Sequence, residues 1–307
     1  MTIRPATGSG HGLTTEVAGL TLRSPVMTAA GCGGPELAAY ADLGALGAVV
    51  TRTVTLDAQA GAPMPRLVET PSGVLSATGQ QNPGLQGFLA TELPWYAQRQ
   101  VRTVVSIGGT APAEYGEIAR RIGTAPGVSA VEVHLRVADR HRTGQVVRAV
   151  RENLPREIPV FAKLGAGGDV VESATAAAEN GADAVVVTAG YPGLLIDPGT
   201  LRPVLGAGEG LLSGPAVHPL ALRDVWDVHE ALPDLSVVGA GGIRSGFDAL
   251  SMLLAGACAV QLGSVLFGDP AAAGRVVDEL TVELAQRGFD RPSDVVGRAH
   301  DPERSGR

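Results

Sequence analysis

The chain is short of several kinds of residue, and each shortage excludes a class of protein. Its 307 residues include only two cysteines, Cys32 and Cys258, which are far apart in the sequence and form no metal-ligand cluster. No stretch reaches the roughly eighteen consecutive apolar residues of a membrane-spanning helix, and the first residues lack the apolar core of a secretion signal. We therefore expect a soluble cytoplasmic protein without a disulfide framework or a metal site.

Charge and aromatic content narrow the class further. The formal net charge is −7 at pH 7, which argues against nucleic acid or an anionic membrane as a partner and leaves a small molecule as the expected one. Aromatic residues make up only 4% of the chain although 45% is hydrophobic. Such a core consists of Val, Ala and Leu, as a parallel sheet covered by helices requires.

Lysine is the scarcest charged residue. Of 24 basic side chains, all except Lys163 are arginine. Lys163 ends the apolar segment Pro159-Val-Phe-Ala-Lys-Leu164, which is typical of a buried strand. Strands of a barrel present their last side chains to the active-site mouth, and a flexible ammonium differs chemically from a guanidinium. We therefore interpret Lys163 as a functional residue rather than a surface one.

Apolar segments typical of parallel strands alternate with amphipathic segments typical of helices. Eight strands favour a closed α/β fold, a (β/α)8 TIM barrel, over an open sheet, because no glycine-rich fingerprint follows the first strand. We predict a single domain over residues 1–307, ordered from about 13 to 290 and frayed over 1–12 and 297–307, with a short hairpin over 17–23 that plugs the barrel. The predicted strands are residues 25–30, 48–53, 103–107, 130–135, 160–164, 184–188, 237–240 and 259–263; the predicted helices are 114–122, 144–153, 171–180, 220–231 and 245–255.

Two connections are too long for ordinary turns of a barrel. Residues 54–85 and 189–215 each follow a predicted strand, so both should lie over the C-terminal mouth. Long connections of this kind are usually lids or binding loops.

Glycine-rich turns close the last two predicted strands. They read Ser236-Val-Val-Gly-Ala-Gly-Gly-Ile243 and Ala259-Val-Gln-Leu-Gly-Ser264. Glycine leaves room for backbone N–H groups to approach an anion, and the turns after the seventh and eighth strands are the usual phosphate site of such barrels. A single turn of this kind would indicate only a tight connection. Two consecutive ones favour phosphate binding.

Several motifs follow one another in the order typical of one family. They are Gly19-Leu-Thr-Leu-Arg-Ser-Pro-Val-Met-Thr-Ala-Ala-Gly31, Leu43-Gly-Ala-Leu-Gly-Ala-Val-Val-Thr-Arg-Thr-Val-Thr55, Gln81-Asn-Pro-Gly84 and Leu212-Ser-Gly-Pro-Ala216. Over about residues 13–290 the chain resembles the dihydroorotate dehydrogenases of class 1, and specifically the 1B-like members.

The resemblance implies that FMN binds at the C-terminal mouth of the barrel. Lys163 matches the family lysine that approaches the pyrimidine edge of the flavin, where a cation stabilises the reduced ring. The segment Ala29, Ala30 and Gly31 would lie behind the ring. The residues that match the phosphate-binding groups are Ser213, Gly214, Gly241, Gly242, Gly263 and Ser264.

The segment after the fourth predicted strand departs from the family pattern. Where the family has Asn-x-Ser-Cys-Pro-Asn, this chain has His134-Leu-Arg-Val-Ala-Asp139. The position of the catalytic cysteine is Val137, which cannot remove a proton. An aspartate at position 139 would be unfavourable beside an anionic substrate. The four positions of the asparagines that hold orotate are Ser76, His134, Asp139 and Ala189, and the lysine of the second strand is Arg52.

We therefore predict an FMN-dependent oxidoreductase that exchanges hydride between flavin N5 and a small substrate other than dihydroorotate, at a CH–CH-type bond. His134 is the expected acid or base because an imidazole titrates near neutrality. The expected catalytic residues are His134, Lys163 and Arg52, and the expected substrate-binding residues are Arg52, Ser76, Asn82, Arg136 and Asp139.

Other interpretations stay open. The chain could be a genuine dihydroorotate dehydrogenase of pyrimidine biosynthesis, a non-catalytic FMN-binding barrel or partner subunit, or a flavin-free isomerase or aldolase that uses the same glycine turns. A homodimer is an open alternative to a monomer. An iron–sulfur and FAD-containing electron-transfer subunit is implied by the resemblance alone.

Overall fold

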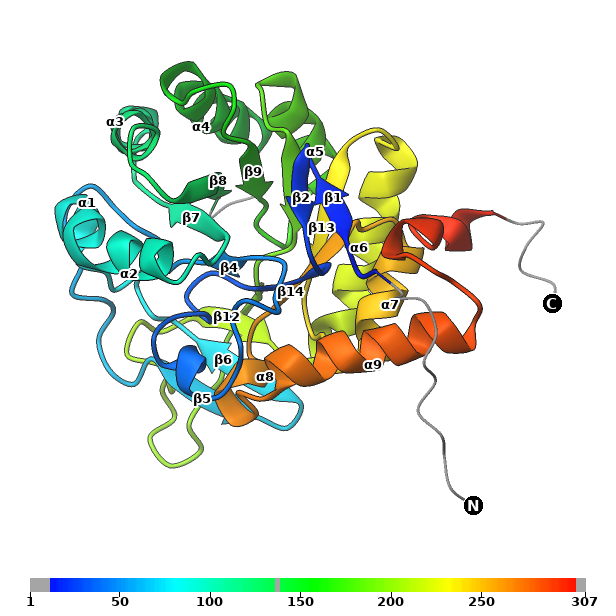
Figure 1. Ribbon diagram of the computed structural model, residues 1–307. Coiled ribbons are helices and arrows are strands. Elements are labelled where there is room, and N and C mark those ends of the chain that lie inside the picture. The colour runs from blue at the N-terminus through cyan, green and yellow to red at the C-terminus, as the bar shows by residue number, and fades with distance from the viewer. Residues whose placement is uncertain (1–11, 136–138, 302–307) are drawn as a thin grey trace.

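The structure is a computed structural model that describes residues 12–135 and 139–301, and its centre is a closed barrel of eight parallel strands (Figure 1). Neighbouring strands pair in the order β4-β7-β8-β9-β10-β13-β14-β3, and a parallel bridge between Met27 and Ala48 closes the ring. All eight predicted strands are confirmed. They are β3 (Val26–Thr28), β4 (Val49–Val50), β7 (Thr103–Ile107), β8 (Val128–His134), β9 (Val160–Lys163), β10 (Ala184–Val187), β13 (Ser236–Ala240) and β14 (Ala259–Leu262).

Helices follow the strands and cover the outside of the barrel. The five predicted helices correspond to α3 (Pro112–Ile122), α4 (Arg140–Asn153), α5 (Val170–Glu179), α6 (His218–Ala231) and α7 (Gly246–Leu254). The sequence analysis did not predict α9 (Ala272–Gln286), although Val276, Leu280 and Leu284 repeat at four-residue spacing and are buried. Shorter helical segments are η1 (Leu37–Ala39), α1 (Gly84–Gly87), η2 (Phe88–Glu92), α2 (Leu93–Gln98), η3 (Pro215–Val217), α8 (Val265–Gly268), η4 (Pro292–Asp294) and η5 (Arg298–His300).

An N-terminal hairpin closes one end of the barrel. Strands β1 (Thr15–Val17) and β2 (Leu20–Leu22) pair antiparallel, and the fully buried Val17 and Leu22 pack with Met27 and Phe161 in the inner core. The hydroxyl of Thr15 donates to the carbonyl oxygen of Cys258 over 2.9 Å, which fastens the hairpin to the barrel. The predicted plug is confirmed.

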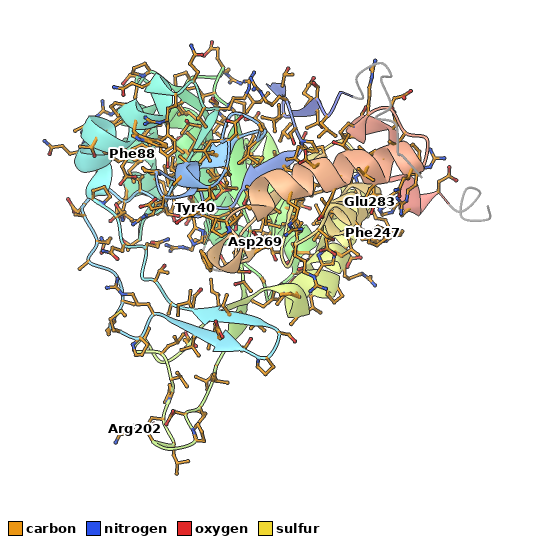
Figure 2. The ribbon with its side chains drawn as sticks, turned by 60° about the horizontal axis from the view of Figure 1, so that its bottom comes forward. Tyr40, Phe88, Arg202, Phe247, Asp269 and Glu283 are labelled. Carbon is orange, nitrogen blue, oxygen red and sulfur yellow. The ribbon has the colours of Figure 1, made fainter. Side chains whose placement is uncertain are left out.

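The two long connections form a sheet of their own, which the sequence analysis had described only as loops. Strands β5 (Leu67–Thr70), β6 (Gly73–Ser76), β11 (Tyr191–Gly193) and β12 (Gly210–Ser213) pair antiparallel in the order β11-β12-β6-β5. Strand β5 pairs with β6 and β11 with β12 within one connection, and the pairing of β6 with β12 joins the two connections, so neither leaves long runs of unpaired N–H and C=O groups. In Figure 2 the loop that carries Arg202 projects beyond this sheet, away from the barrel.

Residues 297–301, which were expected to be frayed, lie against the barrel. The ring of His300 stacks on Trp226 with centroids 3.6 Å apart, and the N–H of Gly297 donates to the carbonyl oxygen of Leu253. Within the described residues, no helix is both long enough and apolar enough to cross a membrane.

Candidate cofactor and substrate site

Two glycine-containing turns, after β12 and β13, meet at the mouth of the barrel. Gly241 and Gly242 follow β13 with φ of +134° and +66°, and Gly214 follows β12 with φ of +109°, all in the region that favours glycine. A Cβ atom on Gly242 would lie 2.7 Å from the carbonyl oxygen of Gly214. The predicted residues Ser213, Gly214, Gly241 and Gly242 are therefore brought together, although they lie about thirty residues apart in the sequence.

The turns after β13 and β14 present unpaired backbone N–H donors. Among residues 12–135 and 139–301, the N–H groups of Gly241, Gly242, Gly263 and Ser264 have no protein acceptor, and all four residues are only partly exposed. Half-buried N–H groups normally find a partner. Ser264 starts α8 without using its hydroxyl as a helix cap. This donor set fits a phosphate group.

The start of α7 is not part of that cradle, because its own residues satisfy it. One carboxylate oxygen of Asp248 accepts from the N–H groups of Arg244 and Ser245, each over 3.0 Å. The hydroxyl of Ser245 accepts from the N–H of Asp248, which completes a capping box. The capping box fixes the end of the turn after β13. The N–H groups of the glycines in that turn remain available for an anion.

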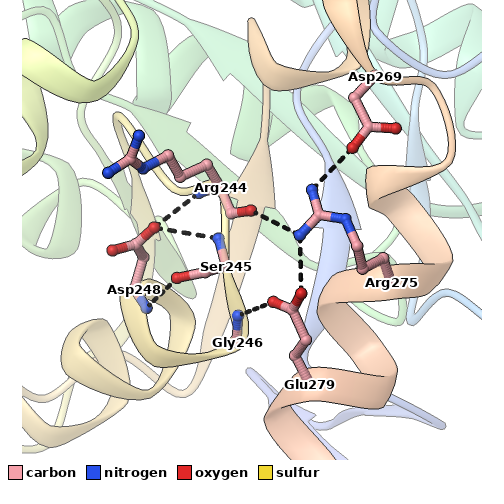
Figure 3. Close-up of polar contacts among 7 residues, drawn as sticks. All are labelled: Arg244, Ser245, Gly246, Asp248, Asp269, Arg275 and Glu279. Carbon is pink, nitrogen blue, oxygen red and sulfur yellow. Dashed lines mark hydrogen bonds and ion pairs between the residues drawn. The ribbon is translucent and has the colours of Figure 1, made fainter.

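Helix α9 fastens this turn from outside (Figure 3). The carboxylate of Glu279 accepts from the N–H of Gly246 over 2.7 Å and from Arg275 over 2.8 Å. Arg275 also donates to the carbonyl oxygen of Arg244 and to Asp269, over 3.2 and 2.8 Å. One arginine thus joins α9, the turn after β13 and the residue that follows α8.

A polar layer lies above the apolar inner core. Glu132, Lys163 and Gln261 come two residues after Ala130, Phe161 and Ala259 of the inner core, so their side chains point into the barrel. Lys163 Nζ donates to Gln261 Oε1 and Gln261 Nε2 donates to Glu132 Oε2, each over 2.6 Å. Lys163 Nζ lies 4.0 Å from Glu132 Oε1. The lone lysine is therefore buried, and its counter-charge is a carboxylate of zero exposure.

Two predicted residues follow this layer toward the mouth. Ala29 and His134 come two positions after Met27 and Glu132, which gives them the same inward register. His134 is half-buried and pairs in register with Lys163 across β8 and β9. Arg52 is exposed, and its charge opposes the rise that burial causes in the pKa of Glu92.

The segment after β3 completes this side of the mouth. The N–H of Ala29 donates to the carbonyl oxygen of Leu262 over 2.7 Å, and that of Gly31 donates to Thr51 over 3.1 Å. Ala30 lies between them and is partly exposed. Cys32 follows, and burial raises the pKa of its thiol to about 11 even though the Lys163 charge acts to lower it. Cys32 is therefore a poor base at neutral pH.

Two predicted substrate-binding residues have structural roles. The carboxylate of Asp139 accepts from the N–H of Arg142 over 2.6 Å and caps α4, and Asp139 is exposed. The amide of Asn82 makes four hydrogen bonds: it accepts from the N–H groups of Thr55 and Gly84 and donates to Thr55 Oγ1 and the Gln80 carbonyl. A substrate contact by Asn82 would break one of them.

The structure shows less about the other residues predicted to lie near the substrate. Ser76 ends β6 and pairs with Leu211 of β12 in the sheet over the mouth. Arg136 and Val137 lie outside the described residues. No group of three or more His, Cys, Asp or Glu side chains that could hold a metal occurs in the part of the chain that the structure describes.

Sequence reasoning missed the partners that hold the predicted residues in place. Glu132 and Gln261 were visible as polar residues inside otherwise apolar strands, which is unusual for buried positions. Arg275 and Glu279 had no such signal, because their importance depends on how α9 packs against the turn before α7.

A closed barrel whose last two strands end in glycine turns, with N–H groups that are unpaired within the described residues, is typical of barrel enzymes that bind phosphate. A family model described as dihydroorotate dehydrogenase matches residues 12–284. The chain belongs to the dihydroorotate dehydrogenase family. The cofactor of this family is FMN, which agrees with the predicted cofactor and with the donor set after β13 and β14.

Individual relatives support the assignment. The chain is 38% identical over 301 residues to a protein of Anoxybacillus flavithermus, covering 94% of this chain and 96% of the relative. It is 42% identical over 298 residues to one of Desulforudis audaxviator, covering 92% and 96%. Both are named dihydroorotate dehydrogenase B (NAD(+)), catalytic subunit. They support the 1B-like resemblance and give no support to a substrate other than dihydroorotate.

A solved structure shares the fold. The dihydroorotate dehydrogenase of Eimeria tenella, crystallised with ferulenol, superposes with a TM-score of 0.79 at 22% identity, covering 95% of this chain and 89% of that one. At this identity the likeness concerns the fold alone, and it confirms the barrel.

Proposed function

We propose that this chain is an FMN-dependent oxidoreductase that oxidises dihydroorotate. The main support is that relatives named for this activity match it over more than nine-tenths of its length, and that its phosphate cradle has donors in place. This is one of the alternatives that the sequence left open. The preference for another substrate rested on the missing cysteine at position 137, on the four positions without the family's asparagines, and on Arg52 in place of a lysine.

One of those residues no longer argues against dihydroorotate. An aspartate at position 139 was expected to repel an anionic substrate. Its carboxylate instead caps α4 and is exposed, so its charge is used at a helix start. This removes the electrostatic objection and leaves the missing cysteine and the missing asparagines as the departures from the family pattern.

In this proposal the glycine turns hold the FMN phosphate. The N–H groups of Gly241, Gly242, Gly263 and Ser264 would donate to it, with Ser213 and Gly214 beside them. The segment Ala29–Gly31 would support the ring, and Lys163 would stand at its pyrimidine edge. When bound, FMN supplies a site that accepts a hydride at N5.

The chain's own side chains would bind the substrate and take up its proton. Arg52 is exposed beside the Gly31 segment and is suited to a carboxylate, and we assign the same role to Arg136. Position 137 holds valine, so His134 is our candidate for the group that removes the proton. It has the inward register and lies one layer above Glu132.

A second candidate is a related cyclic amide or unsaturated acid. It is favoured by one observation: none of the four positions at which the family carries its orotate-binding asparagines is an asparagine here. A site built for hydrogen bonds to one ring discriminates strongly against others.

The proposal of a partner follows from the relatives, which are named as catalytic subunits. We propose that electrons leave through an NAD-linked second subunit.

The deciding experiment is an anaerobic half-reaction. Protein reconstituted with FMN is mixed with dihydroorotate, and the flavin absorbance is followed. Rapid bleaching that is lost in His134→Ala would support the first proposal. Bleaching only by other cyclic amides would support the second. A flavin that dithionite reduces but no metabolite does would indicate a non-catalytic barrel, and failure to bind FMN would end all flavin proposals.

A further inference from the structure

The buried carboxylate of Glu132 has no role in the proposal so far. Its side chain has zero exposure, and Oε1 has no hydrogen-bond partner among the described residues. A buried ionised group is costly unless it is paired, so its presence needs a reason. The nearest opposite charge is Lys163 Nζ, 4.0 Å from that oxygen.

Gln261 fixes the distance between the two charges. Its amide oxygen accepts from Lys163 and its amide nitrogen donates to Glu132, each over 2.6 Å. An amide can bridge an ammonium and a carboxylate in only one orientation, because its nitrogen has no lone pair to offer. The bridge therefore keeps the pair close without direct contact. It also leaves two of the three N–H bonds of the ammonium available.

We propose that Glu132 and Gln261 are positioning residues that set the charge which Lys163 presents to the flavin. This inference rests on the proposed FMN site. An unpaired ammonium would strongly favour electron uptake by the ring, since it would stabilise the negative charge that reduction creates. Glu132, held at a fixed distance, offsets part of that charge. The triad therefore determines how easily the bound flavin is reduced.

The test is the midpoint potential of bound FMN, measured by anaerobic dye equilibration on reconstituted protein. Glu132→Gln keeps the shape and removes the counter-charge, so it should favour reduction at least tenfold, which is about 30 mV upward for a two-electron couple. Lys163→Gln should lower the potential by more than this, because Glu132 offsets only part of the lysine charge. The double variant contains neither charge and should lie between Lys163→Gln and the wild type.

The double variant keeps the test valid if either single variant misfolds, because it leaves no buried charge unpaired. The step from Lys163→Gln to the double variant also measures Glu132 alone. Ser106→Ala is the matched control: it removes a buried hydroxyl that hydrogen-bonds Thr53 inside the same barrel, without a change of charge, and should leave the potential unchanged.

Two outcomes would overturn the inference. One is a Glu132→Gln protein that binds FMN with an unchanged potential, which would make the triad merely structural. The other is a double variant whose potential is no higher than that of Lys163→Gln, which would show that Glu132 does not offset the lysine charge. Neither outcome would contradict the proposed function. A wild-type protein that failed to bind FMN would contradict the proposed function and this inference together.

Discussion

The turns after β13 and β14 and the segment after β8 lie at the same mouth of the barrel, but they are held differently. The turns present backbone N–H groups, and α9 fastens them through Arg275 and Glu279. After β8, the N–H of Leu135 donates to the carbonyl oxygen of Lys163, and the side chain of Asp139 caps α4. A site that binds its ligand through backbone N–H groups requires few residue types other than glycine. A site that binds its ligand through side chains changes its specificity when those side chains are substituted. A family can therefore keep its cofactor site while its substrate site diverges.

The strongest test of the comparison is Gly242→Ala. The new Cβ would lie 2.7 Å from the Gly214 carbonyl oxygen, and φ is +66°, so the turn must shift. We expect FMN affinity to fall by about 100-fold or more, roughly 3 kcal/mol. Fluorescence quenching of FMN measures this. Gly274→Ala is the control, because nothing lies within 4 Å of its Cβ position. Equal behaviour of the two variants would show that the cradle is elsewhere.

A smaller effect is expected from Arg275→Gln. The variant loses the bonds to Arg244 and Asp269 and frees Glu279, but leaves the cradle glycines unchanged. Loss of precise positioning should weaken FMN binding by about tenfold. Arg287→Gln, which breaks an ion pair with Glu283 elsewhere on α9, serves as the matched control. If both variants bind FMN equally well, the contact between α9 and the turn has no part in the cofactor site.

On the substrate side, Asp139→Ala tests whether this residue is structural. Loss of the α4 cap should cost about 1 kcal/mol of unfolding free energy, measured by chemical denaturation, and Asp139→Ser should restore most of it. KM for the substrate should change less than twofold in both variants. A large rise in KM that serine does not reverse would return Asp139 to the substrate site.

The smallest effect is expected from Cys32→Ala. Burial raises the pKa of the thiol from 9.0 to about 11, so at pH 8 its thiolate fraction is roughly 100-fold below that of a free cysteine. Native protein should therefore resist iodoacetamide at pH 8, as seen by mass spectrometry. The rate of flavin reduction should be unchanged in the variant. A tenfold loss of that rate would make Cys32 a replacement for the missing base.

Much of the fold could be read from the sequence because its signals are local. Eight apolar runs marked the barrel strands, and the glycines marked the cradle. The sheet over the mouth was not predicted, because β6 and β12 find each other only across more than a hundred residues. The cap at Asp139 was not foreseen, since alignment with a family motif overlooks the helix that begins at Arg140, and its predicted contact with substrate stays a prediction. The role of Lys163 was expected, but not the carboxylate that balances it.

The contact between α9 and the turn after β13 has a consequence for biosynthesis. The eighth strand is complete at Leu262, whereas Arg275 and Glu279 come later in the chain. A nascent polypeptide that has left the ribosome only as far as Asp269 contains all eight barrel strands, yet the turn after β13 still lacks its outer contacts from α9. Under the proposed function, we therefore expect firm binding of FMN only after this last long helix has emerged and docked.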